Sequence, residues 1–163
     1  MTHDFSAQLR EGQACEGRVA DWLLARGYPC EPATDAEQRH GIDLWVATSG
    51  GRRSVQVKQD ARSERTGRIC IELVSVDTRG TPGWAYSCSA DWLFIVQPMG
   101  GRGFWLRPGA LRLHIPRWEQ MADARVRDYI RFRAPNDGYN TTGLCVPVGV
   151  VEALAVAVAR LHG

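Results

Sequence analysis

The sequence predicts one α/β domain in which helices flank a central β-sheet. Three patterns favour this class: apolar residues at helical spacing near the N-terminus, two alternating runs joined by glycines, and a continuous apolar run that ends at Pro98. The 163 residues are 44% apolar and 23% charged, which is typical of one globular domain. We therefore interpret residues 1–163 as a single domain with its own hydrophobic core.

The N-terminal half is predicted to contain one helix and four strands. The helix follows from apolar residues three and four positions apart, and Gly27 ends it as a C-terminal glycine does. Two of the strands flank the turn Ser49-Gly50-Gly51 and therefore form a β-hairpin. The expected elements are a helix over residues 6–26, strands over residues 28–31, 42–47, 54–59 and 69–76, and polar loops over residues 34–40 and 60–68.

The C-terminal half is predicted to mix strands and helices. Its clearest strand is the run WLFIVQ, which is apolar on both faces, as a buried central strand is. Pro108 is a favourable first residue for the helix that follows it. The expected elements are a turn over residues 78–83, strands over residues 92–97, 104–106 and 144–148, and helices over residues 109–114, 118–129 and 150–161.

Five cysteines are spread along the chain without a CxxC pair. Their odd number, and an N-terminus that lacks an apolar run, indicate a reducing cytoplasm rather than export. No apolar segment is long enough to predict a membrane span. We expect free thiols that pack as small apolar side chains at all five positions, Cys15, Cys30, Cys70, Cys88 and Cys145.

The positive charge of the chain is almost entirely arginine. Lys58 is the only lysine among the 20 basic residues, and the net charge is only +2. Arginine carries a large, delocalised charge, so a site that needs a compact ammonium group does not accept it in place of lysine. Lys58 is either a surface lysine that survived by chance or a residue with a specific chemical task, and its place on a hairpin strand favours the second interpretation.

The predicted hairpin brings three polar side chains to one patch. Gln56 and Lys58 are two positions apart on the second strand, so they share a face, opposite Val55 and Val57. Asp43 lies near the start of the first strand. Carboxylate and amide oxygens bind a hard cation such as Mg²⁺, and an adjacent ammonium group stabilises charge on a phosphate. The patch therefore suits metal-dependent hydrolysis of a phosphodiester bond.

These residues resemble the active-site pattern of the PD-(D/E)XK nuclease superfamily. That pattern is an acidic residue, a hairpin, and then Glu or Gln, any residue and Lys; here it reads Gly41-Ile42-Asp43 and Gln56-Val57-Lys58. The variant with Gln is similar to methylation-dependent restriction nucleases. A helical acid, here Glu16, is similar to the arrangement in archaeal Holliday-junction resolvases.

The resemblance implies a fold and an activity. The fold is a restriction-endonuclease-like core over about residues 7–97, in which helices flank a mixed central sheet, with additional strands and helices over residues 98–163. The activity is hydrolysis of phosphodiester bonds in DNA by an endonuclease that depends on Mg²⁺ or Mn²⁺. A homodimer is expected if the enzyme cuts both strands of a duplex.

The resemblance also implies a role for each residue of the patch. Asp43 binds the metal, and the Gln56 side chain and the Val57 carbonyl complete its inner shell. Glu16 assists directly or through water. Lys58 orients or activates the attacking water and stabilises the charge that develops on the phosphate. The alternative is that neither residue belongs to a site. Gln56 would then be a solvent-facing cross-strand residue, and Glu16 a solvated helix residue.

A basic segment follows the hairpin. Arg62, Arg65 and Arg68 are expected to contact DNA phosphates and so to position the DNA without reading its sequence. Trp84, in a turn-rich segment, is a candidate for stacking on a base. His40 precedes the first motif and is a candidate for binding phosphate or water. The alternative is that these residues belong to solvated loops.

Two other functions stay open. The first is a non-catalytic nucleic-acid-binding module that keeps the nuclease fold, with the neutral Gln56 as a sign of lost catalysis. The second is a small α/β protein-interaction domain, which would bind neither metal nor DNA. A titration with a divalent metal near neutral pH separates the catalytic interpretation from both.

Overall fold

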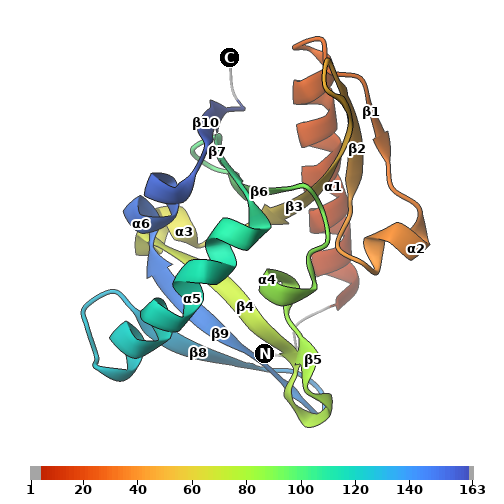
Figure 1. Cartoon of the computed structure of the whole chain (residues 1–163). Coiled ribbons are helices and arrows are strands. Elements are labelled where there is room, and N and C mark those ends of the chain that lie inside the picture. Colours follow the sequence, from red (N-terminus) through yellow and green to blue (C-terminus); the bar gives the residue numbers. More distant parts are fainter. Residues whose placement is uncertain (1–4, 162–163) are drawn as a thin grey trace.

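Two β-sheets form the framework of the chain. The computed structural model describes residues 5–161, and Figure 1 shows helices on both sides of the sheets. The first sheet is mixed, since one pair of neighbouring strands is parallel and the other pairs are antiparallel. The predicted class, α/β with a mixed sheet flanked by helices, is confirmed. The six strands lie in the order β1 (Cys30–Pro32), β2 (Leu44–Thr48), β3 (Gly51–Gln59), β6 (Trp92–Gln97), β7 (Arg102–Leu106) and β10 (Ala157–Arg160).

The second sheet is antiparallel and was not predicted from the sequence. Its four strands lie in the order β5 (Thr81–Pro82), β4 (Arg68–Val76), β9 (Asn140–Pro147) and β8 (Ile130–Pro135). Residues of the C-terminal half thus contribute strands to both sheets.

The described residues also form six α-helices and one 3-10 helix. None of these helices is both long enough and apolar enough to cross a membrane. They are α1 (Phe5–Leu24), α2 (Asp35–Gln38), α3 (Ser63–Thr66), η1 (Asp77–Arg79), α4 (Trp84–Ser87), α5 (Pro108–Asp123) and α6 (Val148–Leu154).

α1 covers one face of the first sheet, alongside β2 and β3 (Figure 1). Its buried residues are four positions apart, so they form one apolar side of the helix. The alternation predicted for β3 is confirmed, because its valines face this helix. The residues in contact include Cys15, Val19, Leu23, Val55 and Val57.

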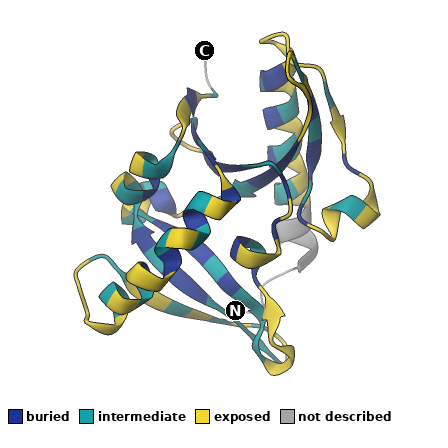
Figure 2. Ribbon diagram, viewed as in Figure 1, coloured by how far each residue is buried: buried dark blue, intermediate teal, exposed yellow. Residues whose placement is uncertain are grey.

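The opposite face of the first sheet shares a second core with α5, β4 and β9 (Figure 2). Each of its central side chains is at most 2% exposed, and burial of one such large apolar side chain contributes about 1.5–3 kcal/mol. This core holds the two sheets and α5 together. Its members include Leu93, Ile95, Phe104 and Leu106 of the first sheet, Ile69, Ile71, Leu144 and Val146 of the second, and Leu111, Ile115 and Trp118 of α5.

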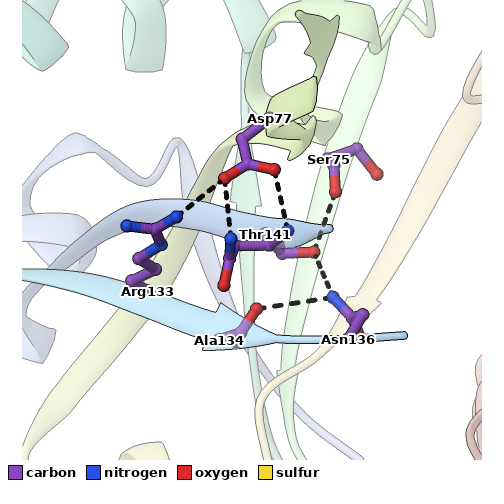
Figure 3. Close-up of polar contacts among 7 residues, drawn as sticks. Ser75, Asp77, Arg133, Ala134, Asn136 and Thr141 are labelled. Atoms are coloured by element: carbon purple, nitrogen blue, oxygen red, sulfur yellow. Dashed lines mark hydrogen bonds and ion pairs between the residues drawn. The ribbon is translucent and has the colours of Figure 1, made fainter. Parts of the chain in front are cut away.

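A polar network joins the strands at one end of the second sheet (Figure 3). Asp77 accepts hydrogen bonds from the backbone and side-chain N–H groups of Asn140, both at 2.8 Å, and from Arg133 at 3.2 Å. The Thr141 hydroxyl donates to the Ser75 carbonyl at 2.9 Å. Paired polar groups therefore hold this end of the sheet, where the apolar core does not reach.

The two helices predicted over residues 109–114 and 118–129 are wrong as separate elements. One helix, α5, runs from Pro108 to Asp123 and continues through Pro116. A proline inside a helix removes one backbone hydrogen bond and is unfavourable. The helix persists because its apolar side is packed into the core on both sides of the proline, through Ile115 and Trp118.

The helix predicted over residues 150–161 is also wrong in its second half. α6 ends at Leu154, Ala155 is extended, and the chain continues as β10, which pairs with β7. Strand β8 was missed. β10 gains backbone hydrogen bonds with β7, a strand distant in sequence, and local apolar spacing does not reveal such a partner. β8 forms a hairpin with the next strand, β9, which pairs on its other side with the distant strand β4.

The expectation of five free thiols is wrong for one pair of cysteines. Cys70 of β4 lies directly opposite Cys145 of β9, and the two form a disulfide across 75 residues of sequence. The other three, Cys15, Cys30 and Cys88, are free as expected. The cytoplasmic location stays a prediction, and this pair does not support the reduced state from which it was inferred.

Candidate active site

Asp43 lies where β2 separates from β3. The two strands pair as far as Leu44 opposite Val55, and the Asp43 N–H still donates to the Val55 carbonyl at 2.9 Å. The Val57 N–H, farther along the edge of β3, donates to the Asp43 carboxylate oxygen Oδ2 at 2.7 Å. The Asp43 side chain thus takes the place of a backbone partner, and only 8% of the residue is exposed.

Gln56 and Lys58 share the face of the first sheet that is turned away from α1. Gln56 lies beside Leu93 of β6 and Lys58 lies beside Ile95, because β3 and β6 run parallel in this register. Gln56 is only 3% exposed, whereas Lys58 is half-buried.

The side-chain oxygen of Gln56 is an orphaned polar atom. Among the described residues, no donor forms a hydrogen bond with this buried Oε1. Leaving a buried acceptor unpaired destabilises a fold by about 1–3 kcal/mol. A ligand that pairs with the Gln56 oxygen would remove this penalty, so the atom marks a possible ligand position.

Glu16 approaches the hairpin from α1. Arg18, two residues after Glu16 on α1, donates a hydrogen bond from Nη2 to Gln59 Oε1 at 3.2 Å. This bond joins α1 to the end of β3. Burial, reinforced by the negative charge of Asp43, raises the pKa of Glu16 to about 7, while the positive charge of Lys58 lowers it. Glu16, Asp43 and Lys58 are therefore within electrostatic reach of one another.

The Asp43 carboxyl group is also harder to ionise than in water. Burial raises its pKa, whereas the Lys58 ammonium group and the Val57 N–H lower it. Loss of hydration thus acts on both acids of the site, and Lys58 is the positive charge that opposes it in both cases. A cation bound near the two carboxyl groups would favour their charged forms.

The oxygen atoms available here fit a hard divalent cation. Asp43 offers a carboxylate and Gln56 offers its unpartnered oxygen. The Val57 carbonyl points to the same side of β3 as its N–H, toward Asp43, because both backbone groups of a strand residue face one neighbour. The described residues contain no cluster of three or more His, Cys, Asp or Glu side chains suited to a metal. A cation at this site would therefore depend on amide and carbonyl oxygens as well as carboxylates.

The arginine-rich segment continues directly from β3. Arg62, at the N-cap of the one-turn helix α3, and Arg65, within that helix, are both exposed in a stretch that was predicted to be a loop. Asp60 holds this helix, since its Oδ1 accepts from the N–H groups of Arg62 and Ser63 at 3.0 and 2.9 Å. Both arginines are thereby placed just beyond the end of the strand that carries Lys58.

The other residues predicted to contact DNA are more constrained. Arg68 forms an ion pair with Asp128 at 3.0 Å. Trp84 is half-buried and packs against the core between the two sheets. His40 is exposed, and its carbonyl accepts a hydrogen bond from the Ser89 hydroxyl at 2.6 Å. Their contacts with DNA stay predictions.

Cys88 is a neighbour of the site that the sequence did not indicate. Burial raises the pKa of its thiol, and the charges of Arg112, Lys58 and Asp43 also act on it. Its thiol lies 3.9 Å from the Gly41 carbonyl, across 47 residues of sequence. No local pattern links the segment around Cys88 to Gly41, so only the folded chain reveals that they touch.

A groove of about 530 Å³ lies elsewhere, over the second sheet. Residues of β4, β8, β9, α4 and α5 line it, among them Leu73, Tyr86, Glu119, Arg131 and Thr142. None of the residues assigned to the candidate active site lines this groove. The groove and the candidate active site are therefore separate features of the molecule.

Comparisons with known proteins identify a distant structural neighbour. The sequence matches no protein-family model, and no curated protein is significantly similar to it. Among solved structures, the bacterial homing endonuclease I-Ssp6803I is similar over 61% of this chain and 68% of its own, with a TM-score of 0.48 and 19% sequence identity. A similarity of this degree carries neither fold nor function to this chain, so both depend on the chain's own residues.

Proposed function

We propose that this chain is a divalent-metal-dependent DNA nuclease of the PD-(D/E)XK type. The observation that carries the proposal is the buried, unpartnered Gln56 oxygen, next to the residue whose N–H binds Asp43. The only lysine of the chain follows two positions later on the same face of β3. The proposed metal ligands are Asp43, Gln56, the Val57 carbonyl and, directly or through water, Glu16.

The protein groups of the site have distinct tasks in this proposal. A bound Mg²⁺ or Mn²⁺ would supply Lewis acidity toward a phosphate oxygen and lower the pKa of water. Lys58 holds the attacking water and stabilises the negative charge that develops on the phosphate. Glu16 would assist in its ionised form, directly or through water, because a bound cation favours the carboxylate that burial disfavours in the metal-free site.

DNA is the proposed substrate and partner. Arg62 and Arg65 lie beyond the end of β3 with exposed side chains, so they are available to neutralise phosphates of DNA bound at the site. Cleavage of both strands of a duplex would require two such sites, and a homodimer is the proposed way to supply them.

A cleavage assay on several forms of DNA tests the proposal. Duplex, junction, nicked and single-stranded DNA are each incubated with Mg²⁺, Mn²⁺ or EDTA. We expect cleavage with either metal and none in EDTA, and the preferred form of DNA identifies the substrate class. Cleavage that is undiminished in EDTA would contradict the metal-dependent mechanism.

A non-catalytic nucleic-acid-binding module is the second candidate. It is favoured by the neutral Gln56 and by the shortage of clustered acidic side chains among the described residues. This candidate predicts DNA binding without affinity for Mg²⁺ or Mn²⁺. Calorimetric titration of the metal-free protein with Mn²⁺ near neutral pH separates the two candidates, because only the nuclease is expected to bind the metal.

A further inference from the structure

Gly41 packs directly against the Gln56 carboxamide. Its φ of +73° is a left-handed conformation that favours glycine. A Cβ added to residue 41 would lie 2.7 Å from Gln56 Nε2, 3.0 Å from the Cys88 Cα and 3.4 Å from Gln56 Cδ. Since 2.7 Å is too short for a contact between a methyl carbon and an amide nitrogen, any side chain here would displace the carboxamide or the surrounding backbone.

The backbone around Gly41 is itself held in place. The preceding carbonyl, that of His40, accepts hydrogen bonds from the Ser89 N–H at 3.1 Å and from the Ser89 hydroxyl at 2.6 Å. On the other side of this contact, Arg112 of α5 donates to the Cys88 carbonyl. Two loops that are distant in sequence are thus fixed against each other, and the carboxamide of β3 packs against them.

We infer that Gly41 is a positioning residue that leaves the space in which the Gln56 carboxamide keeps its orientation. The nitrogen Nε2 is the atom nearest to Gly41, and the oxygen Oε1 is the atom without a partner. A side chain at residue 41 would occupy the place of the nitrogen and turn the carboxamide, so the glycine preserves the orientation in which the oxygen is free for a cation. The inference rests on the proposed function, in which Gln56 is a metal ligand.

The need for such a residue follows from the chemistry of glutamine. A glutamate carboxylate has two equivalent oxygens, so either orientation presents an acceptor to a metal. A glutamine has one oxygen and one NH₂ group, and rotation by half a turn replaces an acceptor with a donor. A site with Gln in the second ligand position is thus able to bind a cation only in one orientation, and the glycine at residue 41 leaves room for that orientation.

Calorimetric titration of the metal-free protein with Mn²⁺ tests the inference. Gly41→Ala is expected to weaken Mn²⁺ binding about 10- to 100-fold, as loss of groups that orient metal ligands does. Gly27→Ala is the matched control, because Gly27 also has a positive φ, +81°, but no atom lies within 4 Å of an added Cβ. This control carries the backbone strain without the displacement, and it should bind Mn²⁺ as the parent does.

Two double variants distinguish a positioning role of Gly41 from a general loss of structure. Because Gly41 acts through Gln56, adding Gly41→Ala to Gln56→Ala should weaken Mn²⁺ binding no further. Adding it to Gln56→Glu should weaken binding less than in the parent, since either carboxylate oxygen serves. Equal losses in all backgrounds, or parental affinity of Gly41→Ala, would overturn the inference.

The outcomes also separate this inference from the proposed function. A parent protein that does not bind Mn²⁺ contradicts both, whereas a parent that binds Mn²⁺ as tightly as Gly41→Ala contradicts only the role of Gly41. If thermal melting shows that Gly41→Ala does not fold, the Ser89→Ala variant tests the role of Gly41 instead. Ser89 is exposed, and its replacement removes the hydroxyl that donates to the His40 carbonyl. This change should weaken Mn²⁺ binding when it is made in the parent but not when it is made in Gln56→Ala. Parental affinity of the Ser89→Ala variant would overturn the inference.

Discussion

Asp43 and Asp77 each bind a backbone N–H of a neighbouring strand, but their surroundings act on them in opposite directions. Asp43 accepts from the Val57 N–H at 2.7 Å, and burial nevertheless raises its pKa. Asp77 accepts from the Asn140 backbone and side chain, and with the nearby Arg133 these bonds hold its pKa below the ordinary value (Figure 3).

The difference shows how surroundings assign a role to an aspartate at a strand end. The Asp77 carboxylate has enough partners to favour its charge, so it stabilises the second sheet. The Asp43 carboxylate has lost more hydration than its partners replace. Its charge acts on the half-buried Glu16, and its hydrogen-bond donor, the Val57 N–H, follows the residue with the orphaned oxygen, Gln56. A shortage of partners in a group of polar residues is typical of a site that binds a ligand.

The largest expected effect separates these two aspartates directly. Asp43→Ala is expected to abolish Mn²⁺ binding and DNA cleavage, while the thermal midpoint stays near the parental value or rises, because a desolvated charge is removed. Asp77→Ala is expected to lower the midpoint and to leave Mn²⁺ binding unchanged, because only the polar network of the second sheet is lost. Calorimetric titration and thermal melting measure both; a stable Asp77→Ala that fails to bind Mn²⁺ would reverse the comparison.

The second largest effect is expected for Lys58, the positive charge that acts on Asp43 in the candidate active site. Lys58→Arg is expected to slow cleavage almost as much as Lys58→Ala, by about 10²–10³-fold, since a guanidinium group is larger and disperses its charge. DNA affinity and thermal stability should stay close to those of the parent in both variants. Single-turnover cleavage rates provide the measurement, with Arg62→Lys as a charge-conserving control that should keep its rate. Near-parental cleavage by Lys58→Arg would favour the binding-module interpretation.

The pH dependence of stability should differ between the two regions. Glu16 has a pKa of about 7 in the folded chain against an ordinary value of 4.5, so the folded protein retains a proton that the unfolded chain has lost. Its contribution to stability is therefore full below pH 4.5 and is lost as the pH rises through 7, a change of roughly 1–3 kcal/mol. The lowered pKa of Asp77 acts in the opposite direction, because its contribution is present above its ordinary pKa of 3.8 and is lost as the pH falls below that value.

Urea unfolding in EDTA, at pH values on either side of the window from 4.5 to 7, measures the contribution of Glu16. The Glu16→Gln variant removes the titrating group and should flatten this part of the profile. An identical profile for the parent and the variant would show that Glu16 does not titrate in this window.

The smallest expected effects concern the arginines beyond β3. Arg62→Ala and Arg65→Ala should each reduce the slope of log affinity for DNA against log salt concentration by about 1. Arg68→Ala should reduce it less, because Arg68 is already paired with Asp128. Fluorescence anisotropy in EDTA measures binding without cleavage. An unchanged slope in the triple variant would mean that DNA contacts another surface.

Local patterns were sufficient to predict α1, the β2–β3 hairpin and the buried strand β6. Helical spacing and two-residue alternation report which side of an element is apolar, and the core then uses that side. The same alternation predicted that Gln56 and Lys58 share a face, as the structure has it. These properties depend on neighbours within a few residues, so they can be read from the chain directly.

The features that a sequence pattern could not reveal all depend on contacts between distant segments. The disulfide joins Cys70 to Cys145 because β4 pairs with β9. The last strand forms because the edge of β7 is open to it, and α5 continues past Pro116 because a core on both sides holds it. At the site, the approach of Gly41 to Gln56 and to Cys88 depends on where two loops meet. Such contacts follow from the packing of the whole chain, which provides partners that no local stretch of sequence identifies.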